Sequence, residues 1–135
     1  FALPYLIEIV QLVKQGIKAG PDGKKAPIIL FCKGANHSLT EIAMSGCDVI
    51  GLDWTIDISE VKALMDGHVA LQGNLDPTVL YATEEVIEEK VRAIAKRMKE
   101  PQGHIFNLGH GITPEVDPEN ARAFVKAAKG AYAGK

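Results

Sequence analysis

Four short apolar runs, separated by stretches long enough to form helices, constrain the fold of this chain more than any other feature. They lie at residues 28–32, 49–52, 69–72 and 104–108. None of them alternates between apolar and polar residues, and uniformly apolar strands are typical of a parallel sheet that is covered by helices. Because a helical pattern precedes the first run and follows each of the four, the sequence predicts the order α-βα-βα-βα-βα.

Caps and breakers mark the first predicted helices. A helix over residues 3–18 opens the chain. Ser38 has capping-box spacing and is predicted to begin a helix that ends at Gly46. Ser59 is predicted to cap a further helix, which stops at Gly67.

The longest predicted helix covers residues 84–100. Its acidic residues come early and its basic residues late, which matches the helix dipole. Its apolar stripe consists of Ile87, Val91, Ile94, Ala95 and Met98. The last helix is predicted to start with Asp117 as N-cap and Pro118 in its first turn.

Parallel βα units occur in doubly wound open sheets and in (β/α)8 barrels, and the order of elements alone does not separate the two. No Gly-x-Gly-x-x-Gly motif follows a predicted strand, so the phosphate signal of dinucleotide-binding folds is missing. A barrel needs eight strands and about 250 residues. We therefore predict the α/β class and half of a (β/α)8 TIM barrel. The start at Phe1, inside a helical pattern, indicates truncation.

Charge and hydropathy argue against several kinds of partner. Fifteen Lys and Arg residues against seventeen Asp and Glu residues give a net charge of −2, which offers no general attraction to nucleic acid or to an anionic membrane. No apolar run approaches the ~20 residues that a membrane span needs. No signal-peptide pattern opens the chain.

The two cysteines, Cys32 and Cys47, do not make a disulfide framework, which favours a reducing compartment. We interpret both as small buried apolar side chains. The histidines and cysteines are scattered without the spacing of a zinc site, so no metal is expected.

Function in parallel α/β folds collects where the strands end, at their carboxyl side. This rule selects four segments with polar residues, at 33–37, 53–54, 72–77 and 109–111, and all but the second contain glycine. His110 is the most informative residue, because it lies between Gly109 and Gly111, where the backbone can turn sharply. We predict that His110 belongs to a functional site.

The other histidines are given structural or solvent-exposed roles. His37 is predicted to be a solvated loop residue. His68 and His104 precede strands, at the face of the sheet that serves stability.

The remaining polar residues of these segments leave alternatives open. Lys33 is either an exposed lysine or a partner for an anionic ligand, and Asp53 either orients a neighbour or caps the following turn. Trp54 is predicted to be a packing residue. Asn74 and Asp76 are predicted to cap the turn before Thr78.

Several motifs at these strand ends resemble the uroporphyrinogen decarboxylase family. They are GLDWT at 51–55, QGNLDP at 72–77 and NLGHGI at 107–112, followed by Pro114 and by DPEN at 117–120. The opening LPY helix fits as well, so the resemblance runs from end to end.

The resemblance implies a single (β/α)8 barrel domain, of which residues 1–135 would be the C-terminal half, with the N-terminal half absent. It implies a homodimer, a cytoplasmic or plastid location, and the conversion of the four acetate side chains of uroporphyrinogen III to methyls, giving coproporphyrinogen III. No metal or organic cofactor is implied, since a protonated pyrrole ring is itself the electron sink. The family's catalytic aspartate, arginines, tyrosine and serine would lie in the absent half, so this chain would carry no catalytic residue. Only His110 matches a family residue that contacts the substrate.

Two alternatives remain. Zinc-dependent corrinoid and thiol methyltransferases of the same superfamily use a His-x-Cys pair, but the first strand here ends in Phe31-Cys32-Lys33 without that histidine. A non-catalytic half-barrel used as an assembly module would need only its packing residues, and the intact motifs at the strand ends argue against it.

Overall fold

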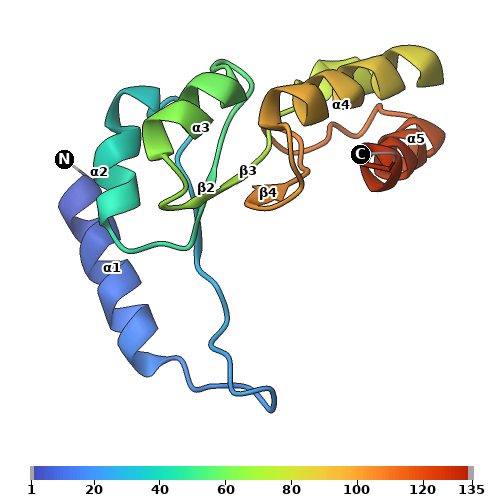
Figure 1. Ribbon diagram of the computed structural model, residues 1–135. Coiled ribbons are helices and arrows are strands. Elements are labelled where there is room, and N and C mark those ends of the chain that lie inside the picture. The colour runs from blue at the N-terminus through green and yellow to red at the C-terminus, as the bar shows by residue number, and fades with distance from the viewer. Residues whose placement is uncertain (1, 134–135) are drawn as a thin grey trace.

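A computed structural model describes residues 2–133, and its helices and strands alternate as predicted (Figure 1). The helices are α1 (Leu3–Gly16), α2 (Leu39–Met44), α3 (Ile58–Met65), α4 (Glu84–Met98) and α5 (Pro118–Gly130). The strands are β1 (Ile29–Phe31), β2 (Val49–Gly51), β3 (Ala70–Gln72) and β4 (His104–Ile105), and two 3-10 helices, η1 (Asn36–Ser38) and η2 (Pro77–Tyr81), follow β1 and β3. Among these helices none is both long and apolar enough to cross a membrane.

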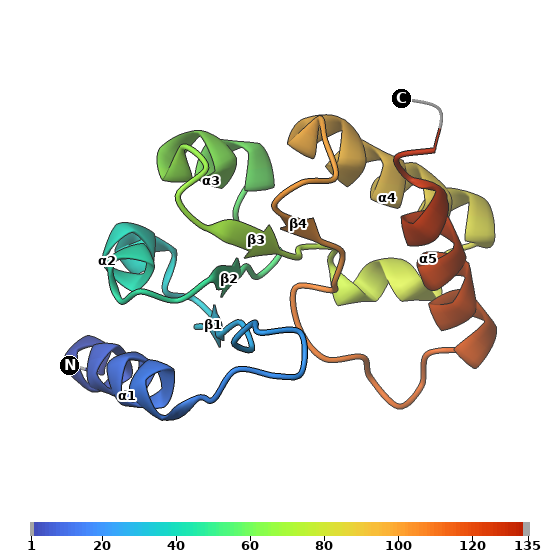
Figure 2. The ribbon, with the colours of Figure 1, turned by 60° about the horizontal axis from the view of Figure 1, so that its bottom comes forward.

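The four strands form one parallel sheet in the order β1-β2-β3-β4. Phe31 of β1 pairs with Gly51 of β2, Gly51 pairs with Gln72 of β3, and Gln72 pairs with Ile105 of β4. Each strand therefore lies beside the next strand in the sequence, as successive units of a barrel do. Figure 2 shows the strands side by side, with α1, α2, α3 and α4 following one another around one side of them.

In the described part of the chain, helices cover one face of the sheet and leave the other open. Ile50 and Leu71 point to that face, are 1% and 2% exposed, and pack in the core with residues of α2, α3 and α4. Phe31 and Ile105 belong to the opposite face and remain 46% and 41% exposed. A doubly wound sheet would carry helices on both faces. The arrangement is therefore half of a (β/α)8 barrel, and the exposed face corresponds to the barrel interior.

The apolar stripe predicted for the longest helix is confirmed. All five of its side chains are at most 5% exposed, and they join α4 to the core: Ile87, Val91, Ile94, Ala95 and Met98. The charges follow the helix dipole, with Glu84 and Glu85 in the first turn and Lys96 and Arg97 in the last. Burial of this stripe fixes α4 against the outer side of the sheet.

The predicted caps are partly correct. Asp117 caps α5, because its carboxylate accepts a hydrogen bond of 2.9 Å from the N–H of Glu119. Ser59 was the wrong residue for α3, since Asp57 is the cap and accepts from both the N–H and the hydroxyl of Ser59. The predicted capping box at Ser38 is also wrong. Its side chain makes no cap bond, because the turn of η1 leads directly into α2.

Both cysteines are free, as predicted. Cys47 is buried in the core, and Cys32 is partly buried against it. Burial raises the pKa of the Cys47 thiol, so the buried side chain is a neutral apolar group.

His104 is a structural residue at the start of β4, on the face of the sheet where a structural role was predicted. Its Nε2 atom lies 2.9 Å from the carbonyl oxygen of Gly73, and its Nδ1 atom lies 2.8 Å from the hydroxyl of Tyr132. Because a carbonyl oxygen only accepts, Nε2 carries the proton of the neutral ring, and Nδ1 accepts from the tyrosine. Burial lowers the pKa of His104 below its usual value.

The lowered pKa of His104 predicts a loss of stability in mild acid. The unfolded chain takes up a proton on this residue near pH 6.5, whereas the folded protein resists it, so stability is complete above that pH and falls as the pH decreases through the folded pKa. We expect urea unfolding at pH 7.5 and 5.5 to show this. Between the two pH values, the free energy of unfolding should fall less in His104→Gln than in the native protein. His68→Gln, at an exposed histidine, is the control and should keep the native pH dependence. Equal losses in all three proteins would contradict the assignment.

Candidate functional site

The carboxyl ends of the strands bring together the polar segments that the sequence selected. Lys33 follows β1, Asp53 follows β2, Asn74 follows β3, and His110 follows β4. Asp53 and Asn74 are 2% and 8% exposed, whereas Lys33 and His110 are exposed. The two buried residues therefore organise this end of the sheet, and the two exposed ones are available to a ligand.

Asp53 both orients a neighbouring loop and caps the turn that follows it, the two roles between which the sequence did not decide. It orients its neighbour by accepting a hydrogen bond of 2.7 Å from the N–H of Gly34, and it caps its own turn by accepting from the N–H of Thr55 at 2.9 Å and from the Thr55 hydroxyl. Burial raises the pKa of Asp53, but the hydrogen bonds from Thr55 and Gly34 outweigh it, and the net pKa is lowered. The ionised carboxylate thus ties the loop after β1 to the loop after β2.

Asn74 was predicted to cap the turn before Thr78, and that prediction is wrong. Its amide instead donates to the carbonyl oxygens of Asp53 at 2.9 Å and of Ile56 at 2.7 Å. The turn is capped by Asp76 alone, which accepts from the N–H of Thr78 at 2.8 Å. An amide can donate to two backbone carbonyls at once, so Asn74 fixes the loop after β2 from the side of β3.

Gly109 lets the loop after β4 approach the loop after β2. A Cβ atom at this position would lie 2.5 Å from the nitrogen of Trp54 and 3.0 Å from the carbonyl carbon of Asp53. The N–H of Gly109 donates to the carbonyl oxygen of Leu75 at 2.7 Å. This contact places the next residue, His110, beside Trp54.

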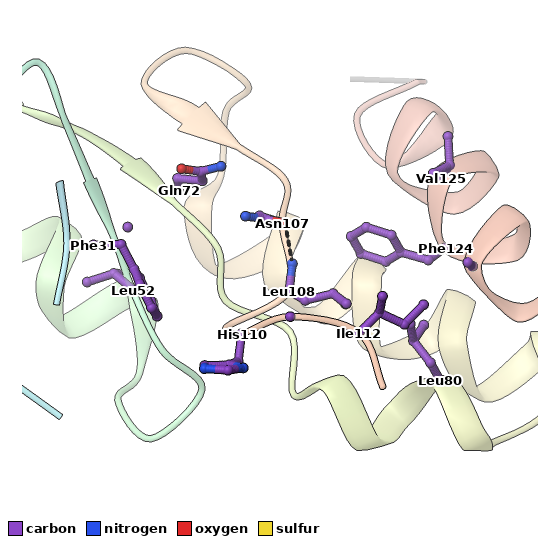
Figure 3. A pocket seen from close by; sticks show the side chains of 13 residues that line it. Phe31, Leu52, Gln72, Leu80, Asn107, Leu108, His110, Ile112, Phe124 and Val125 are labelled. Carbon is purple, nitrogen blue, oxygen red and sulfur yellow. Dashed lines mark hydrogen bonds between the residues drawn. The ribbon is translucent and has the colours of Figure 1, made fainter. Parts of the chain in front are cut away.

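His110 lies at the edge of a cavity on the exposed face of the sheet. Its ring is 6.3 Å, centre to centre, from the rings of both Phe31 and Trp54, and it meets each edge to face. No described residue makes a hydrogen bond to this imidazole, so both ring nitrogens are available to a ligand. In Figure 3 His110 lies on the Phe31 side of the cavity, across from Phe124 of α5.

The cavity has a volume of about 550 Å³ and a mostly apolar lining. Leu52, Leu80 and Phe124 supply apolar walls, and Gln72 supplies a polar group. Such a lining suits a ligand with an apolar ring and polar substituents.

His37 and the three arginines of the chain lie outside this group. His37 is exposed on η1, as predicted for a solvated residue. Arg92, Arg97 and Arg122 lie on α4 and α5, and each pairs with an acidic side chain: Glu88, Asp57 and Glu119 respectively.

Sequence reasoning missed two aromatic residues. Phe31 lines the cavity, and its position two residues before Lys33 was the available signal, because alternate residues of a strand share a face. Tyr81 of η2 forms a hydrogen bond with Thr113, which joins the loop after β4 to the loop after β3. No sequence pattern indicated that contact.

Within residues 2–133, no group of three or more His, Cys, Asp or Glu side chains is arranged to hold a metal ion. The carboxylate of Asp53 and the amide of Asn74 do lie together at the strand ends, but both already form hydrogen bonds with backbone groups.

A half-barrel of parallel βα units with its polar cluster at the strand ends defines a (β/α)8-type chain. A solved structure of the same fold supports this class. It is a methyltransferase from Methanosarcina mazei, which superposes with a TM-score of 0.75 and 19% sequence identity. The superposition covers 98% of this chain and 36% of the methyltransferase chain. At that identity the likeness concerns the fold alone.

The particular family follows from the sequence comparisons. The family model described as uroporphyrinogen decarboxylase (URO-D) matches residues 1–131. The uroporphyrinogen decarboxylase of Hydrogenovibrio crunogenus is 50% identical over 127 residues, and that of Idiomarina loihiensis is 49% identical over 127 residues. Both alignments cover 94% of this chain, and they cover 35% and 34% of the relatives. The chain belongs to the uroporphyrinogen decarboxylase family and spans about a third of the length of these curated relatives.

Proposed function

We propose that residues 1–135 are the C-terminal half of a single (β/α)8 barrel domain, and that the complete barrel is a uroporphyrinogen decarboxylase. The enzyme would convert the four acetate side chains of uroporphyrinogen III to methyls and give coproporphyrinogen III, in haem biosynthesis. The observation that carries this proposal is the identity of about 50% to curated uroporphyrinogen decarboxylases along 94% of the chain.

The chemistry explains what this half contributes. Protonation of a pyrrole carbon makes a cationic ring, which accepts the electrons of the departing carboxylate, so no cofactor is required. The protein must bind the carboxylates and manage protons. In this half His110 is the substrate-binding residue, because it is exposed beside an apolar cavity and has ring nitrogens available to a carboxylate. The residues that handle the protons belong to the preceding half.

We further propose that the complete enzyme is a homodimer in the cytoplasm, or in a plastid if the source has one. The net charge of −2 supports a protein that does not bind nucleic acid.

The assay that tests the function uses the complete barrel, in which this chain follows its N-terminal half. Purified enzyme incubated anaerobically with uroporphyrinogen III should form coproporphyrinogen III and release carbon dioxide. Exhaustive chelation should leave the rate unchanged. Stoichiometric zinc in the purified protein, with activity lost on its removal, would overturn the proposal and favour the methyltransferase alternative.

His110→Asn in the complete barrel is expected to reduce turnover at least about tenfold, the effect of losing one hydrogen bond to a charged group. Its free energy of unfolding should stay within about 0.5 kcal/mol of the native value, because the side chain is exposed and makes no hydrogen bond to a described residue. His37→Asn, at another exposed histidine beyond a strand end, is the matched control and should keep full turnover. Strong unfolding of His110→Asn with a normal rate per folded molecule would assign this residue to the fold instead.

A further inference from the structure

Two side chains, each from a different strand end, border the indole ring of Trp54, which follows a third strand. The Nζ atom of Lys33 lies 5.1 Å from the centre of the Trp54 ring. The His110 ring lies 6.3 Å from the same ring, at an interplanar angle of 82°. These residues follow β1, β2 and β4, so the grouping depends on the folded sheet and not on sequence proximity.

The backbone around each of the three residues is fixed. Asp53 accepts from the N–H of Gly34, directly after Lys33, and from the N–H of Thr55, directly after Trp54. Gly34 has a φ of 74°, a left-handed conformation that turns the chain just past Lys33. Gly109 lies against the Trp54 backbone and positions His110. The buried carboxylate and the close glycine contact therefore hold a cation, an indole and an imidazole together.

The charge of Lys33 is not neutralised within the described part of the chain. No aspartate or glutamate there forms an ion pair with Lys33, and the same holds for Lys18, Lys24, Lys25, Lys96 and Lys129, but among these only Lys33 lies at a strand end against an aromatic ring. Asp53 is close in the fold, but its two oxygens are used by Gly34 and Thr55. Contact with the face of an aromatic ring stabilises an ammonium group without removing its charge. Lys33 is thus an exposed cation without an acidic partner among the described residues, and it is held against the same indole ring as the proposed ligand-binding histidine.

We propose that Lys33 is a second substrate-binding residue of this half-barrel, and that it binds a carboxylate of the porphyrinogen next to His110 while Trp54 holds its side chain in place. The inference rests on the proposed function and extends it. It also gives Trp54 a supporting role beyond packing. The arginines are engaged on α4 and α5, so among residues 2–133 Lys33 is the lysine or arginine that lies at the strand ends.

The test measures binding and turnover separately in the complete barrel. The binding probe is uroporphyrin, an octacarboxylate, titrated by fluorescence. Lys33→Met should raise the Kd for uroporphyrin about tenfold, the effect of losing one hydrogen bond to a charged group. Lys33→Arg should recover most of the affinity. Lys24→Met, at an exposed lysine in the loop between α1 and β1, should bind as the native protein does. In turnover, Lys33→Met should raise KM with little change in kcat, and added salt should weaken binding less than in the native protein.

The possible outcomes separate this inference from the proposed function. Unchanged Kd and KM in Lys33→Met, or a lower kcat at unchanged KM, would overturn the role of Lys33 while leaving the decarboxylase intact. Binding that depends on Lys33, in a barrel that forms no coproporphyrinogen, would support the site and remove the decarboxylase proposal. A native barrel that binds no octacarboxylate would overturn both.

Discussion

Gly109→Ala is expected to destabilise the complete barrel by about 2 to 3 kcal/mol, the typical cost of forcing an atom into a packed region. The added Cβ atom would meet backbone atoms of Asp53 and Trp54, at 3.0 Å or less from two of them. Backbone cannot move aside as the end of a flexible side chain can. The loop after β4 would therefore shift away from β2, and His110 would lose its place beside Trp54. Turnover should fall with stability.

Gly111→Ala is the matched control on the other side of His110. No heavy atom lies within 4 Å of the Cβ position at Gly111, and its φ is not in the left-handed region. The substitution should change the free energy of unfolding by less than about 0.5 kcal/mol. Urea unfolding of the two variants and the native protein, with turnover measured on each, checks the prediction. Equal stability of the two alanine variants would mean that the loops do not approach as closely as the structure has them.

Residues 1–135 produced without the rest of the barrel are expected to have no decarboxylase activity and to self-associate. The face of the sheet that corresponds to the barrel interior carries apolar side chains without a covering layer. Ile29, Phe31 and Ile105 are each between 41% and 46% exposed. Exposed apolar surface of this kind favours association.

The sheet edges add to this tendency. β1 and β4 are the outer strands, and each has a neighbour on one side only. Unpaired edges form hydrogen bonds with strands of other chains. Two copies together supply eight strands, so a pseudo-barrel of two chains is the simplest associated form. Even so, the cationic groups of the preceding half would be missing, and an octacarboxylate substrate would lose most of its binding partners.

The overall architecture could be predicted from the sequence because it follows from local patterns. The apolar runs predicted the four strands, although the run at 104–108 forms a strand at His104–Ile105 and beyond it only one isolated bridge, at Leu108. The stripe of α4 predicted its buried face, and Asp117 with Pro118 predicted the start of α5. His110 was singled out as a candidate because a histidine between two glycines after a strand has few structural reasons to be there. Its binding role remains a prediction.

The contacts that organise the strand ends could not be predicted, because they depend on which strands lie side by side. The Asp53 carboxylate accepts a hydrogen bond from Gly34, 19 residues away, and the Asn74 amide donates one to the Asp53 carbonyl oxygen, 21 residues away. Nothing local distinguishes an asparagine that joins two loops from one that caps its own turn. The error at Asp57 and Ser59 has a different cause: two good capping residues stand two positions apart, and only the backbone geometry selects one.

We propose that this chain supplies half of a decarboxylase barrel and needs the other half to act. Coproporphyrinogen III formation should be measured for the chain alone, for the separately produced N-terminal half, and for the two produced together, with the mass of each sample determined by sedimentation. We predict no product from either half alone, an associated state of this chain, and turnover only when both halves are present in one particle. A monodisperse monomer of this chain that forms coproporphyrinogen III by itself would contradict the claim.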